Sequence, residues 1–434
     1  MSLGFEQAGF DVVAAVESDP VHAGVHRFNF PAAAVIQQEA STISADCLRL
    51  AVARGLANLG RPADQRVDVI VGGPPCQGFS VGGRLRRDDP RNALVAEFVR
   101  LVKALRPRAF MLENVPAMAT AEELASGVRV PAWVDQELDR DGYDVSVPRV
   151  VNASRYGVPQ DRRRLIIFGV ERPLDLPKMP SPKVLPRPKR SSTVARRGEW
   201  GHPEGSELPA GPTVVDAIGD LPNLDEFDEL LATDKVRLPE VSRRDATKVR
   251  SDYARLLAGE MVDASDLSRP RSWDPAFLTS SLRTIHTDTV RLRFEATPPG
   301  ESDSVSRFYR LDPEGLAPTL RAGSTPDRGS YSAPRPIHPF HARVLSVREA
   351  ARLHGFPDWF RFSAAKWHGF RQVGNAVPPP MARALGQEVR RILKFTETGL
   401  PHRVGLGPER LLRVSFGAGR RRKPAAPRLT SVGS

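Results

Sequence analysis

The chain has 434 residues, of which 40% are hydrophobic and 26% are charged; this is ample for a large core and favours two domains, or one domain with an insertion. We expect neither a membrane protein nor a secreted one, because no apolar run reaches the ~18 residues that span a bilayer and the first residues lack the order of a signal peptide. The net charge of +12 favours a polyanionic partner, with nucleic acid first, and the two cysteines argue against a disulfide framework and for a reducing cytosol.

Strand and helix patterns alternate along residues 1–171. An amphipathic helix is predicted over residues 92–105, where apolar side chains recur at helical spacing. Short apolar runs predict buried strands at residues 11–16, 67–71, 109–112 and 165–170. This alternation predicts an α/β fold with a doubly wound, Rossmann-like parallel sheet.

The composition changes beyond this first region. Residues 172–340 are rich in proline and in turn signals, and we interpret them as an inserted, loop-rich domain with β pieces. Regular patterning returns over residues 341–396, where Ser346 and Glu349 form a capping box and a last helix opens at a run of prolines. Residues 397–434 are basic and rich in glycine and proline, and we expect them to form a flexible tail.

The most informative stretch is residues 72–80, with the sequence Gly-Gly-Pro-Pro-Cys-Gln-Gly-Phe-Ser. It follows the predicted strand 67–71, so Cys76 is presented at the carboxyl end of a central strand, where open α/β sheets place their chemistry. The two prolines fix φ and stiffen the turn, and Gly78 leaves room for a planar group to approach the backbone. Taken alone, this turn also fits a structural role with an inert thiol.

Three other segments supply groups that a reactive thiol would need. Glu113 follows the strand 109–112, and because neighbouring parallel strands end at one edge, its carboxylate is expected to face the same pocket. Residues 160–164, Gln-Asp-Arg-Arg-Arg, place two guanidinium groups on one side of an extended chain. Gly374 and Asn375 precede the last helix, whose N-terminus could close a pocket. Each segment alone also fits a structural role, such as a helix cap or a solvated basic edge.

Together, the Gly-Pro-Pro-Cys-Gln-Gly-Phe-Ser, Glu-Asn-Val, Gln-x-Arg-x-Arg and Gly-Asn-x-Val-Pro-Pro motifs resemble, in order and spacing, those of the C5-cytosine DNA methyltransferase family of the bacterial restriction–modification type. The similarity covers about residues 1–170 and 316–390. The resemblance implies that residues 1–171 and 341–396 form a catalytic domain and that residues 172–340 form a target-recognition domain inserted into it.

The resemblance implies methylation of cytosine C5 in duplex DNA at a specific short sequence. Cys76 would add to C6 of a flipped-out cytosine, which makes C5 able to attack an activated methyl group. Glu113 would contact N3 and the exocyclic amine of the base, and Arg164 would bind the base carbonyl oxygen and orient Glu113. Arg162 would lie near the phosphate of the target nucleotide or near the thiolate.

The implied cofactor is S-adenosyl-L-methionine. Glu17 matches the family's ribose-binding acid, and Pro75, Asn375 and Ala376 match its backbone or side-chain contacts to the cofactor. The family normally opens with a strand and an Asp-x-Phe-x-Gly-x-Gly loop that cradles the cofactor, and this sequence starts with what resembles the helix after that loop. We therefore expect weak cofactor binding by the chain as written, and a truncated, non-catalytic DNA-binding remnant is the alternative from another class.

The resemblance also implies DNA contacts from the cysteine loop, from a mobile loop near residue 90 and from the recognition domain, namely Gln77, Ser80, Arg91, Thr319 and Arg321. The expected partners are double-stranded DNA and, functionally, a cognate restriction endonuclease. We expect a monomer in the bacterial cytoplasm, associated with the nucleoid and not with a membrane. A tRNA-directed relative is an alternative that the long inserted region disfavours, and a nucleotide-binding oxidoreductase is remote because no Gly-x-Gly-x-x-Gly follows a strand.

Two histidine pairs have a spacing that could suit metal ligands, namely His22 with His26 and His338 with His341. Neither pair has further ligands at suitable spacing, so we expect no metal site and interpret them as surface pairs.

Overall fold

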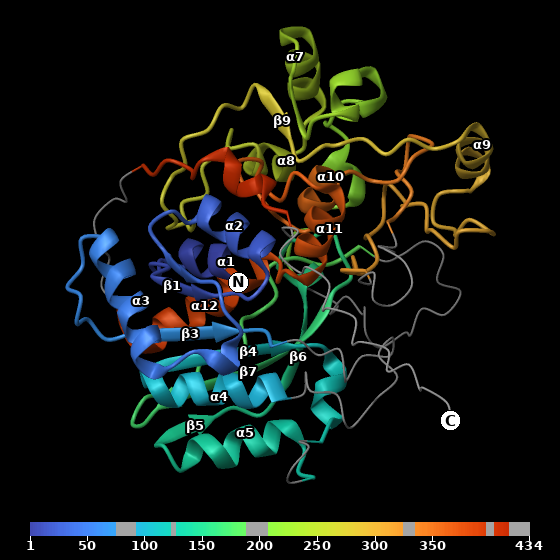
Figure 1. The fold of residues 1–434 in the computed structure, drawn as a ribbon. Coiled ribbons are helices and arrows are strands. Elements are labelled where there is room, and N and C mark those ends of the chain that lie inside the picture. Colours follow the sequence, from blue (N-terminus) through green and yellow to red (C-terminus); the bar gives the residue numbers. More distant parts are fainter. Residues whose placement is uncertain (75–92, 123–126, 188–206, 324–334, 396–402, 416–434) are drawn as a thin grey trace, which may run out of the picture.

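The structure, a computed structural model, describes residues 1–74, 93–122, 127–187, 207–323, 335–395 and 403–415. Figure 1 shows a central sheet with helices on both faces and a second region, built mainly from the middle of the chain, at the other end of the molecule. None of the helices in the described ranges combines the length and the apolar character that crossing a bilayer requires.

The central sheet has five strands, in the order β3-β4-β7-β5, with β6 paired to another part of β7. Their bounds are Val69–Gly72 for β3, Ala109–Asn114 for β4, Tyr143–Val145 for β5, Arg149–Asn152 for β6 and Arg163–Glu171 for β7. Strands β3 and β4 are parallel, so Gly72 lies opposite Leu112 at the edge where both strands end.

The prediction of an all-parallel sheet is wrong at β7. This strand runs antiparallel to β4 and pairs antiparallel with β5 and β6. The connection from β6 to β7 covers only residues 153–162, which is shorter than the dozen or so residues of a parallel crossover. An apolar run marks a buried strand and carries no information about its direction, so the α/β class was predictable while the direction of β7 was not.

A separate two-stranded parallel sheet holds the first strands of the chain. Strand β1 (Ala14–Val16) pairs with β2 (Ala34–Ile36), and the connection between them contains helix α2 (Pro20–Asn29). Helix α3 (Ala45–Asn58) returns the chain toward β3. The strand predicted over residues 11–16 is therefore shorter than expected, and it ends directly before Glu17.

Alternation of side chains along β4 builds two hydrophobic cores. On one face, Ala109 and Met111 pack in a cluster with helices α1 (Ser2–Gln7) and α12 (Pro379–Leu393). On the other face, Phe110 and Leu112 pack in a cluster with helices α4 and α5, whose bounds are Ala93–Leu105 and Val130–Asp139. The N-terminal and C-terminal helices thus cover the same face of the sheet (Figure 1).

The middle of the chain forms short elements with long connections, as the turn signals predicted. Its α-helices and strands are α6 (Val214–Ile218), β8 (Lys235–Arg237), α7 (Glu240–Val249), α8 (Asp252–Leu257), β9 (Phe277–Thr279) and α9 (Asp288–Ala296), and β8 pairs antiparallel with β9. The 3-10 helices of the described chain are η1 (Ala40–Thr42), η3 (Pro116–Thr120), η4 (Ala153–Tyr156), η5 (Leu224–Glu226), η6 (Asp228–Leu231) and η8 (Glu409–Arg413).

Part of the segment predicted to be a flexible tail is packed. Residues 403–415 include η8, and Leu412 on it is buried in a cluster with Val25 and Phe28 of α2. Glu409 also pairs with Lys235 of β8, so this segment joins two regions of the fold. The prediction of a flexible tail followed the basic, glycine-rich composition of the whole segment and gave no weight to its few leucines, which anchor it.

The capping box predicted at Ser346 and Glu349 is confirmed. It starts helix α10 (Val347–Arg352), with the Ser346 hydroxyl accepting from the Glu349 N–H and the Glu349 carboxylate accepting from the Ser346 N–H. The same buried carboxylate accepts two hydrogen bonds from Arg343, at 2.7 and 2.9 Å. Burial alone would raise the pKa of Glu349. The positive charge of Arg343 and the hydrogen bonds to the carboxylate outweigh burial and lower this pKa to about 2.

We expect Glu349→Gln to lower the free energy of unfolding by about 3 kcal/mol at neutral pH, because Arg343 would remain buried without its counter-charge. The pKa of Glu349 lies below its ordinary value of 4.5, so its contribution is complete above about 4.5 and is lost as the pH falls toward about 2. Denaturant unfolding at decreasing pH should therefore show the difference between variant and native chain shrinking.

The matched control is Glu388→Gln, which removes the partner of Arg391 in a solvent-exposed pair on α12. That change should cost less than about 1 kcal/mol. A stability difference for Glu349→Gln that stays constant with pH would contradict the role given to the ion pair.

Candidate functional site

The end of β3 leads the chain past the end of β4. The Asn114 side-chain amide donates a hydrogen bond to the carbonyl oxygen of Pro74 at 3.0 Å. A Cβ added to Gly73 would lie only 2.7 Å from Oε2 of Glu113, so the backbone passes close to that carboxylate. Residues 72–74, which continue toward Cys76, therefore run directly beside Glu113.

Glu113 and Arg164 form a buried ion pair at this edge. Nε of Arg164 lies 2.9 Å from Oε1 of Glu113, and the side chains are 12% and 10% exposed. Burial raises the pKa of Glu113, and the positive charges of Arg164 and Arg162 offset part of the rise. Because its pKa is raised, the Glu113 carboxyl group can hold a proton or share it with a ligand, which suits acid–base chemistry.

Arg162 is buried and bonded to the backbone of other segments. Its guanidinium group is 1% exposed and donates to three backbone carbonyls, those of Leu320 at 3.0 Å, Gly374 at 2.7 Å and Ala376 at 2.9 Å. These three acceptors belong to segments that are distant along the chain, so Arg162 ties these segments together. Its predicted place near a phosphate of the target nucleotide or near the thiolate stays a prediction.

His354 and Gln160 extend this network, and sequence reasoning missed His354 as a site residue. The ring of His354 accepts at Nδ1 from the Gln160 amide at 3.0 Å and donates from Nε2 to the Ala376 carbonyl at 2.9 Å. Complete burial and the charge of Arg162 keep the pKa of His354 well below its ordinary value, so the ring is neutral with this tautomer. The sequence showed His354 only as part of a helix end, because its partners are far away along the chain.

The end of the inserted region lies against this network. The Gln160 carbonyl side-chain oxygen accepts from the N–H of Leu320 at 3.2 Å, and the Thr319 hydroxyl donates to the carbonyl of Asp161 at 2.6 Å. A Cβ on Gly374 would lie 2.5 Å from the backbone of Arg321 and Ala322. The structure therefore places Thr319 beside Asp161 and Arg321 beside Gly374, and the Arg321 side chain is exposed.

The two ends of the predicted cofactor region are accessible. Glu17 follows β1, and its Oε1 accepts one hydrogen bond from the N–H of Asp19 at 2.9 Å, which leaves acceptor capacity on the carboxylate. Asn375 is the last residue of helix α11 (Lys366–Asn375) and is exposed. Ala376 follows it, and its carbonyl already accepts from Arg162 and His354.

Several predicted site residues lie outside the described part of the chain. They are Pro75, Cys76, Gln77, Ser80 and Arg91.

The histidines are not the surface pairs that we expected, because His338 is 3% exposed and His22, His26 and His341 are half-buried. His26 lies against Phe30, and burial lowers its pKa to about 4. His22 meets Asp19 and His368, with one ligand atom of each within 4.8 Å of the others. The Asp19 carboxylate, however, also caps α2 and lies 3.6 Å from the Arg371 guanidinium, so this cluster already contains a positive charge.

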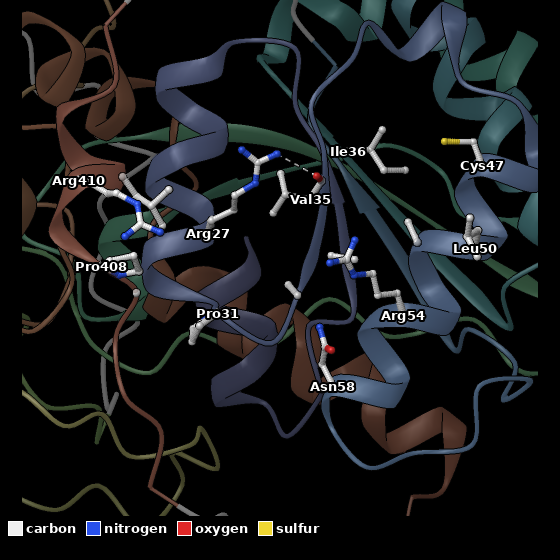
Figure 2. Close-up of a pocket in the computed structure, with 15 residues that line it drawn as sticks. Arg27, Pro31, Val35, Ile36, Cys47, Leu50, Arg54, Asn58, Pro408 and Arg410 are labelled. Atoms are coloured by element: carbon white, nitrogen blue, oxygen red, sulfur yellow. Dashed lines mark hydrogen bonds between the residues drawn. The ribbon is translucent and has the colours of Figure 1, made fainter.

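A cavity of about 740 Å³ lies away from these residues, between α2, α3 and residues 407–411, which include the start of η8. Figure 2 shows Arg27, Arg54 and Arg410 around it, with Cys47 near one end. The Arg27 guanidinium donates to the carbonyl of Val35 on β2, at 3.1 Å. No residue of the network around Glu113 lines this cavity.

Comparison with known proteins gives matches over nearly the whole chain. A family model described as C-5 cytosine-specific DNA methylase matches residues 1–391. The Type II methyltransferase M.XorII of Xanthomonas oryzae pv. oryzae is 41% identical over 421 residues, which cover 96% of this chain and 88% of that protein. The Type II methyltransferase M1.HphI of Haemophilus parahaemolyticus is 32% identical over 396 residues, covering 90% and 84%.

Among solved structures, an E. coli protein assigned as a prophage-encoded DNA modification methyltransferase superposes with a TM-score of 0.65 at 31% identity. The match covers 91% of this chain and 96% of that one. This similarity confirms the predicted α/β, Rossmann-like fold class.

We expect Arg162→Lys to lower the free energy of unfolding by about 1–3 kcal/mol, because a lysine cannot reach all three carbonyls with the fixed fork of a guanidinium. Denaturant unfolding measures this loss, and amide hydrogen exchange should become faster near residue 376. Arg140→Lys on α5, whose native side chain is 72% exposed, is the control and should change stability by less than about 0.5 kcal/mol. Native stability for Arg162→Lys would contradict the anchoring role.

Proposed function

Because this chain belongs to the C-5 cytosine-specific DNA methylase family, we propose that Cys76, Glu113 and Arg164 act together on a flipped-out cytosine, with Arg162 as their positioning residue. The family predicted from the motifs is confirmed, and the chain is a DNA cytosine-5-methyltransferase that uses a methyl donor of the S-adenosylmethionine type. The observation that carries the proposal is the buried Glu113–Arg164 pair, placed where residues 72–74 lead toward Cys76.

In the proposed reaction, the Cys76 thiolate forms a bond to C6 of the ring, and the displaced electron pair makes C5 nucleophilic. Glu113 donates a proton to N3, which neutralises the charge that develops on the ring, and Arg164 holds Glu113 and the base carbonyl oxygen. When bound, S-adenosylmethionine supplies the electrophilic methyl group. Loss of the C5 proton to a base then expels Cys76, and the proton on N3 returns to Glu113.

Protein groups that fit this cofactor stand at the carboxyl end of β1 and at the end of α11. We propose that the Glu17 carboxylate accepts from the two ribose hydroxyls, since it has acceptor capacity left beyond the Asp19 N–H. The exposed Asn375 side chain would supply a further polar contact. Ala376 would lie beside the cofactor without using its carbonyl oxygen, because that oxygen already accepts hydrogen bonds from Arg162 and His354.

The biological setting follows from the relatives. M.XorII and M1.HphI are Type II methyltransferases, and we propose that this chain likewise methylates duplex DNA at one short sequence, paired in function with a restriction endonuclease. The target-recognition role belongs in this proposal to residues 172–340, in which Thr319 bonds to Asp161 and Arg321 lies beside Gly374. The high net charge of +12 suits a polyanionic substrate.

Duplex DNA that carries 5-fluorocytosine should trap the protein. The fluorine cannot leave as a proton does, so the bond from Cys76 to C6 persists and gives a complex stable on a denaturing gel when S-adenosylmethionine is present. Cys76→Ala should give no adduct and retain DNA binding, whereas Cys47→Ala should react like the native chain. An adduct formed by Cys76→Ala would refute the assignment of the nucleophile.

Glu113→Gln should lower the turnover number by about 100-fold or more, because an amide cannot transfer the proton to N3. The pKa of Glu113 is raised, so the acid form persists to higher pH than usual and the native rate should fall as the pH rises past that value. The pre-steady-state rate of methyl transfer, measured at a series of pH values for the native chain and the variant, tests both effects. DNA binding, measured in parallel, is the control. Unchanged turnover, or the same alkaline fall in the variant, would remove Glu113 from the proton step.

A further inference from the structure

Two positively charged side chains from distant parts of the chain meet at one hydroxyl group. Nζ of Lys366 lies 2.9 Å from Oγ1 of Thr284, and Nη1 of Arg335 lies 3.3 Å from the same oxygen. Lys366 also donates to the carbonyl of Arg283. These contacts fix two cations side by side, although one begins α11 and the other belongs to the inserted region.

Neither cation forms an ion pair with a carboxylate among the residues that the structure describes. Asp225 is in the same region, but its carboxylate pairs with Arg283 at 3.1 Å and lies 3.8 Å from Arg291. Burial, and then the charge of Arg335, lower the pKa of Lys366 to about 8. Two half-buried cations that repel each other are stabilised when an anion binds between them.

The surrounding geometry also favours an anion. Lys366 is the first residue of α11, a ten-residue helix whose N-cap, Ala365, is exposed and provides no side-chain cap. The helix end therefore adds a partial positive charge. The Arg335 guanidinium stacks over the ring of Phe370 on the same helix, 4.6 Å from its centroid, which holds the charge in place.

We propose that Lys366, Arg335 and the first turn of α11 bind a phosphate of the DNA backbone. The inference rests on the proposed function, since it needs DNA as the substrate. The opposite end of α11 carries Gly374, which packs on Arg321 and Ala322, and a ten-residue helix is about 15 Å long. A duplex engaged at the catalytic end can thus present a flanking phosphate to the other end of the same helix.

The test is the salt dependence of duplex DNA binding, measured by fluorescence anisotropy over a range of salt concentrations. Each phosphate contact contributes about 0.9 to the slope of log K against log salt. Lys366→Gln should therefore reduce the slope by about 0.9 and weaken binding roughly 8-fold at 0.1 M salt. Lys366→Arg keeps the charge and should restore most of the slope.

Arg49→Gln is the matched control, because it removes one positive charge from α3, where Arg49 pairs with Asp46 on the surface. Its slope should equal that of the native chain. Methyl transfer to DNA by the native chain is measured in parallel, and its absence would count against the proposed function. Suppose that the native chain methylates DNA. The phosphate site is then refuted if Lys366→Gln keeps the native slope of log K against log salt, and equally if its only change is a loss of thermal stability.

Discussion

The site depends on one buried guanidinium group. Arg162 directly precedes β7 and donates to carbonyls of Leu320, Gly374 and Ala376, which lie more than 150 positions further along the chain. Each of these carbonyls would be costly to bury without a donor, so the three segments can pack together only around this group. Removing it would release the segment around Leu320 from the helix end that precedes α12.

The packing around Arg162 also sets the pKa values of the neighbouring groups. His354 completes the network as a neutral ring, because complete burial and the charge of Arg162 both oppose its protonation. The charges of two arginines lower the pKa of Glu113, but burial raises it by more, so the pKa stays above its ordinary value. In the proposed reaction, Glu113 exchanges one proton with the base, and a single titrating group among groups of fixed charge suits that step.

Local signals were enough to locate much of this arrangement. The apolar runs gave β3 and β4, and because these strands are parallel, the expectation that residues 72–74 and Glu113 share an edge followed from topology alone. The role of Arg162 could not be predicted, since strand alternation tells which side a residue faces and not what fills that side. His354 escaped notice for the same reason, as its partners come from other segments.

The central claim is that Arg162 organises the site while Arg164 and Glu113 meet the base. A crystal structure of the protein bound to duplex DNA containing 5-fluorocytosine tests it most directly. We expect the Arg162 guanidinium on the same three carbonyls, with Glu113 and Arg164 at the edge of an extruded ring that is bonded to Cys76. An Arg162 side chain turned onto the DNA, with its carbonyls left to other donors, would contradict this account.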